Sequence, residues 1–418
     1  MNQTSHSSIV LVGIDWADKL HAFHLAGSGR EQHGMFEQDS LVIEKLLDQW
    51  RADHPGADFA IAIEATKGAI INSLLGYDDV TIYPVNPAAL ANYRKAFKHG
   101  GGKNDPADAL LLCQYLEHYI DQLRPLRRDD PNTREIAALV EDRRRLVDQR
   151  TAHCNELKAV LKQYFPEVLK LGAAKIYAAF LIRFLLKYST LQAAQKAGVT
   201  RLRKFFFGCG AKTKVVDRVK LLVNATSLSD DEVLLRTCSR RVIAICKLIE
   251  TYNQQVRQYD AEIKALVRNH SDYKIFASLP GASDKTQGRM IAALGDDRTR
   301  FPTASSLQTA SGIAPLTTQS GKTKFVSCRW ACSKFLRQTF HEYAGLSILS
   351  SKWAAAYYKL QRDKGKSCQG AKRAKRALAF KWQRIIHRCW QTGEPYDEAR
   401  YIARLKATGS PLVDLMDA

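Results

Sequence analysis

The sequence KNDPADA, residues Lys103–Ala109, is the stretch around which the chain is organised. Asp105 and Asp108 are three residues apart, so on a helix their carboxylates share one face. Pro106 fits the first turn of a helix, where its missing N–H costs no hydrogen bond. Ala109–Tyr119 follows with apolar residues at helical spacing. Two acids at a helix start predict a divalent cation site or, as the alternative, an N-capping aspartate with a solvated neighbour.

The residues before this stretch predict a mixed sheet with helical crossovers. The expected strands are Ile9–Ile14, Ala22–Ala26, Arg30–Phe36, Asp58–Ile63 and Val80–Val85, and the expected helices are Asp39–Trp50, Lys67–Leu75 and Pro87–Phe97. This is the order of an RNase H-like domain, in which three strands form an antiparallel meander and later strands add in parallel. Asp15 and Glu64 each end a central strand, and in this layout the two strand ends are neighbours.

Four carboxylates, those of Asp15, Glu64, Asp105 and Asp108, should therefore meet at one edge of the predicted sheet. Oxygen ligands suit hard cations, and Mg²⁺ or Mn²⁺ is bound by a few carboxylates together with water and phosphate oxygens. Two such ions can activate an attacking group and stabilise the leaving oxygen of a phosphodiester. The set predicts a catalytic metal site.

Charge and composition indicate the class of partner. The chain of 418 residues has a net charge of +21, which favours nucleic acid over a membrane surface. No apolar run is long enough to span a bilayer and no signal peptide is recognisable, so we expect a cytoplasmic protein. The nine cysteines are expected to be reduced thiols. A zinc site from Cys328, Cys332 and His341 is an alternative whose spacing matches no standard pattern.

Two long helices are expected after Pro131. The first opens at Asn132–Glu135, a capping-box-like start, and runs to about Tyr164; the second opens at Ser229–Glu232. Apolar residues of the second helix step alternately by three and four: Leu235, Cys238, Val242, Ile245, Ile249, Tyr252, Val256, Tyr259, Ile263 and Leu266. This heptad seam favours a coiled coil that joins subunits or separates domains, and the alternative is a long helix buried in a single-chain bundle.

Two stretches are strongly basic. Arg201–Lys220 holds seven Lys or Arg and one Asp, and Lys359–Arg388 holds eleven against one Asp. Such stretches suit neutralisation of a phosphate backbone. Phe205–Phe207 lies inside the first one, and we expect these rings to be core rather than stacking platforms. The residues predicted to contact nucleic acid are Lys103, Arg201, Arg203, Lys204, Lys212, Lys214, Lys322, Lys324, Lys372, Arg373, Lys375 and Arg376.

Several motifs carry a resemblance to a known family. They are GIDWADK at 13–19, IEATKG at 63–68, KNDPADA at 103–109, LPG at 279–281, FPTASSLQTASGIAP at 301–315, QSGKTK at 319–324, LAFKW at 378–382 and YDEARY at 396–401. Together they resemble the DEDD, RuvC-like insertion-sequence transposases, a family that includes the Piv DNA invertases and works with a bridge RNA. The match covers most of the chain. Residues 165–228 do not match well, and we interpret them as an insertion relative to shorter members of the family.

The resemblance implies a serine nucleophile, and Ser320 occupies that position. A serine on a turn next to Gly321 is accessible to a phosphate, and Lys322 and Lys324 could stabilise the developing charge. The alternative is a Thr- and Ser-rich turn that closes a helix. Thr317 and Thr318 are the fallback hydroxyls.

The resemblance also implies partners and a mechanism. Ser320 would attack a scissile phosphate at the metal site, and strand exchange would reverse that step. The partners would be donor and target DNA, a non-coding bridge RNA that guides the choice of sequence, and further copies of the chain, as a dimer that assembles to a tetramer. The acids and the serine of one active site would come from different subunits. The competing interpretations are a junction-resolving nuclease that uses water and a non-catalytic RNA-guided DNA-binding protein.

The expected fold class is α/β plus α in three domains. Residues 1–130 form the RuvC-like DEDD domain, 131–270 form the long helical, coiled-coil region with the basic insertion at about 165–228, and 271–418 form a mainly helical transposase domain with the serine.

Overall fold

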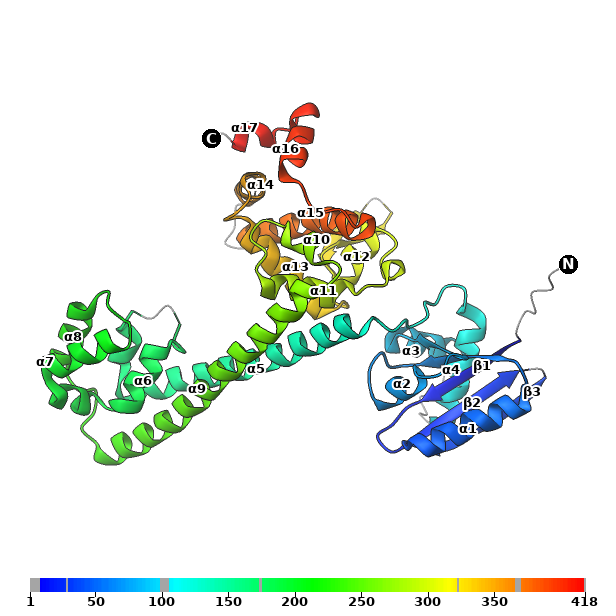
Figure 1. The fold of residues 1–418 in the computed structure, drawn as a ribbon, viewed down its shortest axis with the longest axis horizontal. Coiled ribbons are helices and arrows are strands. Elements are labelled where there is room, and N and C mark those ends of the chain that lie inside the picture. Colours follow the sequence, from blue (N-terminus) through cyan, green and yellow to red (C-terminus); the bar gives the residue numbers. More distant parts are fainter. Residues whose placement is uncertain are drawn as a thin grey trace. The chain divides into compact units, whose positions relative to one another are not determined.

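The computed structural model describes residues 8–27, 29–97, 105–172, 175–321, 323–364 and 370–416. The chain divides into two compact units, Met1–Arg128 and Asp129–Ala418, called here the N-terminal and the C-terminal unit (Figure 1). Within the described ranges, no helix is both long enough and apolar enough to cross a bilayer. Eight of the nine cysteines lie in these ranges, and all eight are free thiols.

The N-terminal unit is built on a five-stranded sheet of order β3-β2-β1-β4-β5. Its strands are β1 Ile9–Asp15, β2 Leu20–Gly27, β3 Arg30–Glu37, β4 Asp58–Ile63 and β5 Val80–Pro84. β1, β2 and β3 pair antiparallel, whereas β4 joins β1, and β5 joins β4, in parallel. The predicted meander and the predicted parallel additions are therefore confirmed.

Helices cover both faces of this sheet. They are α1 Ser40–Asp53, α2 Ala69–Leu74, α3 Pro87–Phe97 and α4 Asp105–Tyr119. Asp39 caps α1 as predicted, accepting from the amides of Leu41 and Val42. Alternate strand residues divide between two cores: Val12 and Ile61 pack with residues of α1 and α2, whereas Leu11, Ala60 and Ala62 pack with Leu112 and Leu116 of α4.

Helix α4 crosses β1 at close range because β1 has a glycine at the crossing point. A β-carbon at Gly13 would collide with the carbonyl oxygen of Ala109 and the amide nitrogen of Cys113. The Cys113 thiol also donates to the carbonyl of Leu11 at 3.5 Å. These contacts lock the register between helix and strand.

The C-terminal unit contains two long helices, α5 Pro131–Tyr164 and α9 Glu232–Asn269 (Figure 1). They are antiparallel, because residues rising along α5 contact residues falling along α9: Arg143 with Asp260, Arg150 with Asn253 and Arg241 with Glu156. The caps differ from those predicted. Asp130 caps α5 and Asp231 caps α9, so the capping-box starts at Asn132 and Ser229 were wrong.

The heptad seam of α9 is buried inside its own chain. Ile245 is 4% exposed and Ile249 is fully buried, and both lie in a core with Leu157 and Leu161 of α5. The same core includes α6 Ala179–Lys187, α7 Leu191–Gly208 and α8 Val215–Val223. This is the single-chain bundle that was the alternative to the coiled coil. A 3/4 spacing predicts an apolar stripe, but it does not say which chain covers that stripe.

The remaining helices surround a second core of the C-terminal unit, which includes Trp353, Trp382 and Trp390. They are α10 Tyr273–Ala277, α11 Asp284–Leu294, α12 Ala304–Ala310, α13 Lys334–Ser347, α14 Lys352–Asp363, α15 Gly370–Thr392, α16 Glu398–Ala407 and α17 Leu412–Met416. Ile136 of α5 and Ile263 of α9 also enter this core. The long helices therefore join both cores into one compact unit.

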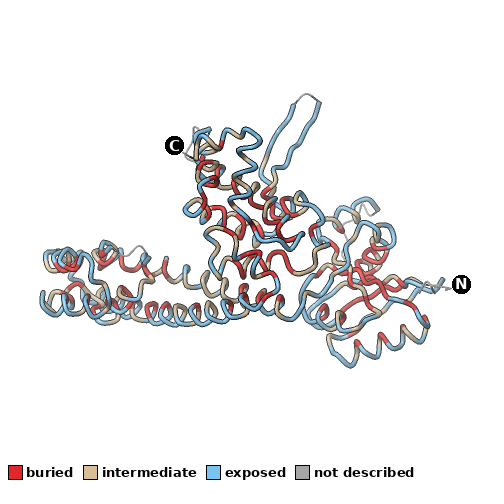
Figure 2. The backbone as a smooth tube through the Cα atoms, turned by 45° about the horizontal axis from the view of Figure 1, so that its top comes forward, coloured by how far each residue is buried: buried red, intermediate tan, exposed pale blue. Residues whose placement is uncertain are grey.

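A β-hairpin interrupts these helices where the sequence analysis expected no strands. β6 Pro315–Ser320 pairs antiparallel with β7 Thr323–Cys328. All of β6 is exposed, and Figure 2 shows the hairpin as two exposed strands that leave the body of the unit. The alternative interpretation, in which this stretch is a turn that closes a helix, was wrong. A hairpin depends on pairing between two strands, and the sequence of one segment does not identify the segment with which it pairs.

Candidate active site and nucleic-acid surfaces

Asp15 and Glu64 lie at neighbouring strand ends. Ile14 of β1 pairs with Ile63 of β4, so the next residue of each parallel strand is one of these acids. Alternation along the strands puts both on the same face as Gly13 and Ala62, which is the face that α4 covers. Neighbouring strands lie about 4.8 Å apart, so the two acids share one corner of the sheet.

The first turn of α4 leads to the same corner. Ala109 lies over Gly13 and Cys113 reaches back to Leu11, so α4 runs antiparallel to β1. One helical turn back from Ala109 is Asp105, about 6 Å along the axis. Two residues on from Gly13 is Asp15, about 6.6 Å along the strand. The backbone therefore brings the start of α4 to the end of β1.

Asp108 is buried and paired. It is 4% exposed, and Arg94 of α3 donates to its Oδ1 at 2.6 Å. Since an unpaired charge is costly in a protein interior, this guanidinium stabilises the buried carboxylate. The Nε of Arg94 is buried and has no hydrogen-bond partner among the described residues. The sequence analysis did not identify Arg94, because nothing in the pattern ties α3 to α4.

The side chains of the four acids are not gathered into a closed metal site. Across the described ranges, no three His, Cys, Asp or Glu side chains are grouped so that they could hold a metal ion, and this includes the alternative zinc set of Cys328, Cys332 and His341. The acids at the sheet corner offer oxygen donors only, which fits Mg²⁺ or Mn²⁺. Lys103 lies outside the described residues.

Ser320 closes the β6–β7 turn. It pairs with Thr323 across the hairpin, and Gly321 at φ 56° supplies the left-handed turn conformation. Thr318 faces the same side of β6 as Ser320, whereas Thr317 faces the opposite side. Lys324 is exposed on β7, and Lys322 lies outside the described residues.

The basic insertion presents its predicted contact residues to solvent. Arg201, Arg203, Lys204, Lys212 and Lys214 are all exposed. Arg218 is the exception in this stretch, because it is 7% exposed and donates to the carbonyls of Leu171, Ala211 and Thr213. Phe206 is fully buried as expected, but Phe207 is 53% exposed.

The predicted contacts at the start of α15 divide into two groups. Lys372 and Arg373 are exposed and Lys375 is half-buried. The guanidinium of Arg376 instead donates to the carbonyls of Gly312 and Ile313 and contacts the Cys328 thiol. The nucleic-acid contact predicted for Arg376 stays a prediction, and all three of its guanidinium nitrogens contact the protein.

A groove of about 690 Å³ between α15 and α16 carries two arginines of the basic stretch Lys359–Arg388 and two further arginines of α16 that the sequence analysis did not identify. Arg384, Arg388, Arg400 and Arg404 line it, and none of them forms an ion pair with a carboxylate in the part of the chain that the structure describes. Tyr401 of α16 also lines the groove. Burial raises the pKa of its hydroxyl to about 12, while Arg384 and Arg404 act in the opposite direction.

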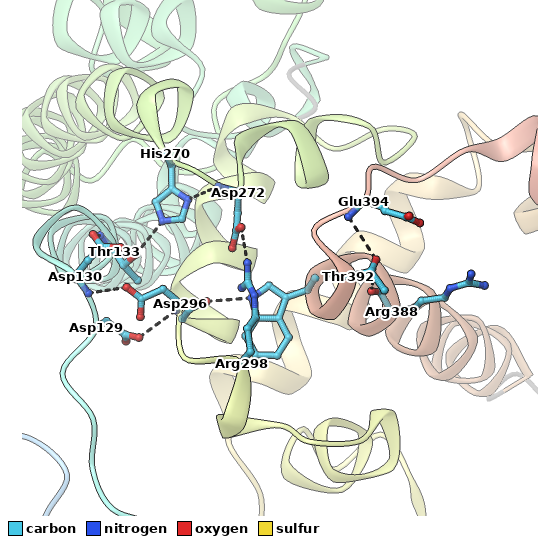
Figure 3. A network of polar contacts seen from close by, with 12 residues as sticks. Asp129, Asp130, Thr133, His270, Asp272, Asp296, Arg298, Arg388, Thr392 and Glu394 are labelled. Carbon is cyan, nitrogen blue, oxygen red and sulfur yellow. Dashed lines mark hydrogen bonds and ion pairs between the residues drawn. The ribbon is translucent and has the colours of Figure 1, made fainter.

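A buried polar network joins the start of α5 to the end of α9 (Figure 3). Thr133 contacts Nε2 of His270 at 2.8 Å and donates to Asp130, while the backbone N–H of Asp272 donates to His270 Nδ1. Arg298 then pairs with Asp272 at 2.5 Å. Burial lowers the pKa of His270, which favours the neutral ring. We therefore interpret the network as structural, because it joins the two long helices.

Comparisons with known families match both ends of this arrangement. Residues 12–166 match the family profile of the DEDD transposases of the IS110 type, and residues 273–359 match the profile described as transposase IS116/IS110/IS902 family. The first match includes all four acids. The second includes the β6–β7 hairpin.

Similar proteins come from insertion elements. The IS117 mini-circle protein of Streptomyces coelicolor, whose name calls it a transposase, is 25% identical over 409 residues, which is 96% of this chain and 98% of that protein. The IS116 protein of 44.8 kDa from Streptomyces clavuligerus is 24% identical over 373 residues, covering 87% of this chain and 90% of that protein. The chain belongs to the IS110/IS116 family of insertion-sequence transposases.

Proposed function

We propose that this transposase cuts and exchanges DNA strands with a divalent metal at the corner of the sheet and with Ser320 as nucleophile. The observation that supports the metal site best is the shared corner of β1, β4 and α4, toward which the backbone brings Asp15, Glu64 and Asp105, although their side chains do not form a ligand group among the described residues. Asp108 would complete the set once its carboxylate turns from Arg94. A bound Mg²⁺ or Mn²⁺ supplies Lewis acidity to a scissile phosphate.

Ser320 carries the group transfer in this proposal. Its Oγ attacks phosphorus and loses its proton, the bond to the leaving strand breaks, and that strand departs as a hydroxyl. The phosphoserine that results holds the other strand until the reverse step joins it to the partner DNA. An exposed hydroxyl at the closing pair of a hairpin supports this role, because a phosphate can reach it from outside the body. Lys322 and Lys324 would stabilise the developing charge, although Lys324 pairs with Gln319 on the face of the hairpin opposite Ser320.

Basic surfaces would hold the nucleic acids in the cytoplasm. The exposed cations of the insertion and of the start of α15 would neutralise phosphates, and a bridge RNA would select donor and target DNA by base pairing. Assembly of dimers into a tetramer would bring acids and serines of different copies together. The α9 seam is occupied within the chain, so subunits would meet through other surfaces.

A suicide DNA substrate tests the nucleophile. The wild-type chain should form a protein–DNA adduct that survives denaturant, and Ser320→Ala should lose the adduct while it still binds nucleic acid. Thr318→Ala is the matched control, because its hydroxyl lies two residues away on the same face of β6. An adduct that persists in Ser320→Ala contradicts the assignment and directs the search to Thr317 and Thr318.

Two other functions have support from particular observations. The acid corner belongs entirely to the N-terminal unit, which suits a junction-resolving nuclease that uses water. The Arg94–Asp108 pair suits a non-catalytic DNA-binding protein guided by RNA. Cleavage without any adduct favours the nuclease, and guided binding without cleavage in Mn²⁺ favours the binding protein. Asp15→Asn should abolish cleavage and leave the fold intact under either catalytic function.

A further inference from the structure

Helix α15 contacts both feet of the β6–β7 hairpin through one side chain. The Nε of Arg376 donates to the carbonyl of Ile313 at 3.1 Å, and its Nη2 donates to the carbonyl of Gly312. These two residues lead into β6. The Nη1 of the same guanidinium contacts the Sγ of Cys328, the last residue of β7, at 3.2 Å.

A second pair of contacts lies on the same face of α15. Gln383 donates to the hydroxyl of Ser311 at 2.8 Å, and Gln308 donates to the carbonyl of Phe380 at 2.8 Å. Arg376, Phe380 and Gln383 step by four and three, so they form one face of the helix. Gln383 and Ser311 are both fully buried, and buried hydrogen bonds of this kind favour one orientation of the joined segments.

The other described residues of the hairpin, 315–321 and 323–327, make no such side-chain hydrogen bond to the body of the unit. β6 is exposed along its whole length, and Phe325 and Val326 of β7 are 68% and 58% exposed. A two-stranded hairpin is only marginally stable alone, so its direction depends on its feet. Ser320 is seven residues beyond Ile313, a span of roughly 23 Å, and a tilt of about 10° at the feet would move it by about 4 Å.

We propose that Arg376, supported by Gln383, is a positioning residue that sets the direction in which the hairpin presents Ser320 to DNA. The inference rests on the proposed role of Ser320 and adds the residue that orients it. It touches neither DNA nor the reacting atoms in this role. Nucleophilic attack tolerates little misplacement, since an error of about 1 Å can cost on the order of a hundredfold in rate.

Hydrogen exchange on the full chain without nucleic acid tests whether Arg376 holds the two ends of the hairpin. Arg376→Ala should make the amides of residues 313–317 and 326–328 exchange about tenfold faster or more, because a charged donor no longer joins the two feet. Arg373→Ala is the matched control: the same helix loses an exposed arginine one turn earlier, so hairpin exchange should stay as in wild type. Unchanged exchange in Arg376→Ala overturns the proposal.

The reaction tests the consequence for Ser320. At saturating DNA, Arg376→Ala should slow adduct formation on the suicide substrate about tenfold or more while DNA affinity stays the same, whereas Arg373→Ala should weaken DNA binding. Arg376→Lys, which keeps the charge and one donor direction, should restore part of the rate even where the alanine variant folds poorly. Faster hairpin exchange with a wild-type adduct rate overturns the positioning role and leaves Ser320 intact. If the wild-type chain forms no adduct, Ser320 is not the nucleophile, and the positioning role proposed for Arg376 is then contradicted as well.

Discussion

The Arg94–Asp108 pair neutralises one of the four acids that are predicted to bind metal. Asp108 stands in the first turn of α4, where the sequence pattern predicts a metal ligand, yet its carboxylate is buried against a guanidinium. A cation at the corner would take over the neutralisation of this charge. In the proposed metal site, the arginine and the metal would therefore compete for the same oxygens.

Arg94→Ala is expected to lower the stability of the N-terminal unit by about 3 kcal/mol in the absence of divalent metal, because it leaves a buried carboxylate unpaired. Mn²⁺ should recover part of that loss in the variant and should add less to the wild type. Chemical denaturation with and without Mn²⁺ measures both effects, and Arg94→Lys is the conservative control. An equal loss in both conditions would show that no cation binds beside Asp108.

At the scale of elements, α5 and α9 form an antiparallel pair within one chain. Polar residues cross-link the pair at intervals, and the α9 seam fills the core between these links. Leu248, next to the buried Ile249, points outward and is 45% exposed. Substitutions at these two neighbouring positions therefore distinguish an effect on folding from an effect on self-association.

Ile249→Asp should destabilise the C-terminal unit by about 4 kcal/mol or more, because it buries a charge with no partner. Leu248→Asp should leave the melting temperature within a few degrees of wild type. Thermal denaturation compares the two variants, and light scattering reports their oligomeric state. If Ile249→Asp stays fully folded and becomes monomeric, the seam joins subunits and the intrachain pairing is wrong.

At the scale of the whole molecule, which has a net charge of +21, the arginines differ in whether they are paired with carboxylates. Many arginines are paired with carboxylates, as Arg51, Arg143 and Arg289 are. The arginines of the α15–α16 groove lack such partners among the described residues, and Tyr396 and Tyr401 lie beside them. Unpaired cations beside aromatic rings suit a single strand of nucleic acid.

The double variant Arg384→Glu, Arg388→Glu should weaken binding of single-stranded nucleic acid and reduce the slope of log affinity against log salt by about 1 to 2. The matched control is Arg257→Glu, Lys264→Glu, which changes the charge by the same amount at two exposed positions on α9, outside the basic stretches. Fluorescence anisotropy over a range of salt concentrations measures both. Equal effects in the two variants would mean that only the overall charge matters.

Local signals in the sequence were enough to predict several elements of the fold. Strand alternation, the Asp39 cap and the Pro106 start predicted the N-terminal sheet and helix α4, and strand ends led to Asp15 and Glu64. The basic stretches were visible because charge is a property of composition. The family resemblance came from motifs that are short and continuous.

Which segments meet could not be predicted from the sequence and is seen only in the folded chain. The partner of the α9 seam, the Arg94–Asp108 pair, the β6–β7 hairpin and the use of Arg376 all join residues far apart in the chain. No local pattern identifies such a partner, because burial and hydrogen bonding depend on which surfaces come together in space. An arginine in a basic run looks the same in sequence whether it faces phosphate or, like Arg376, holds two backbone carbonyls in place.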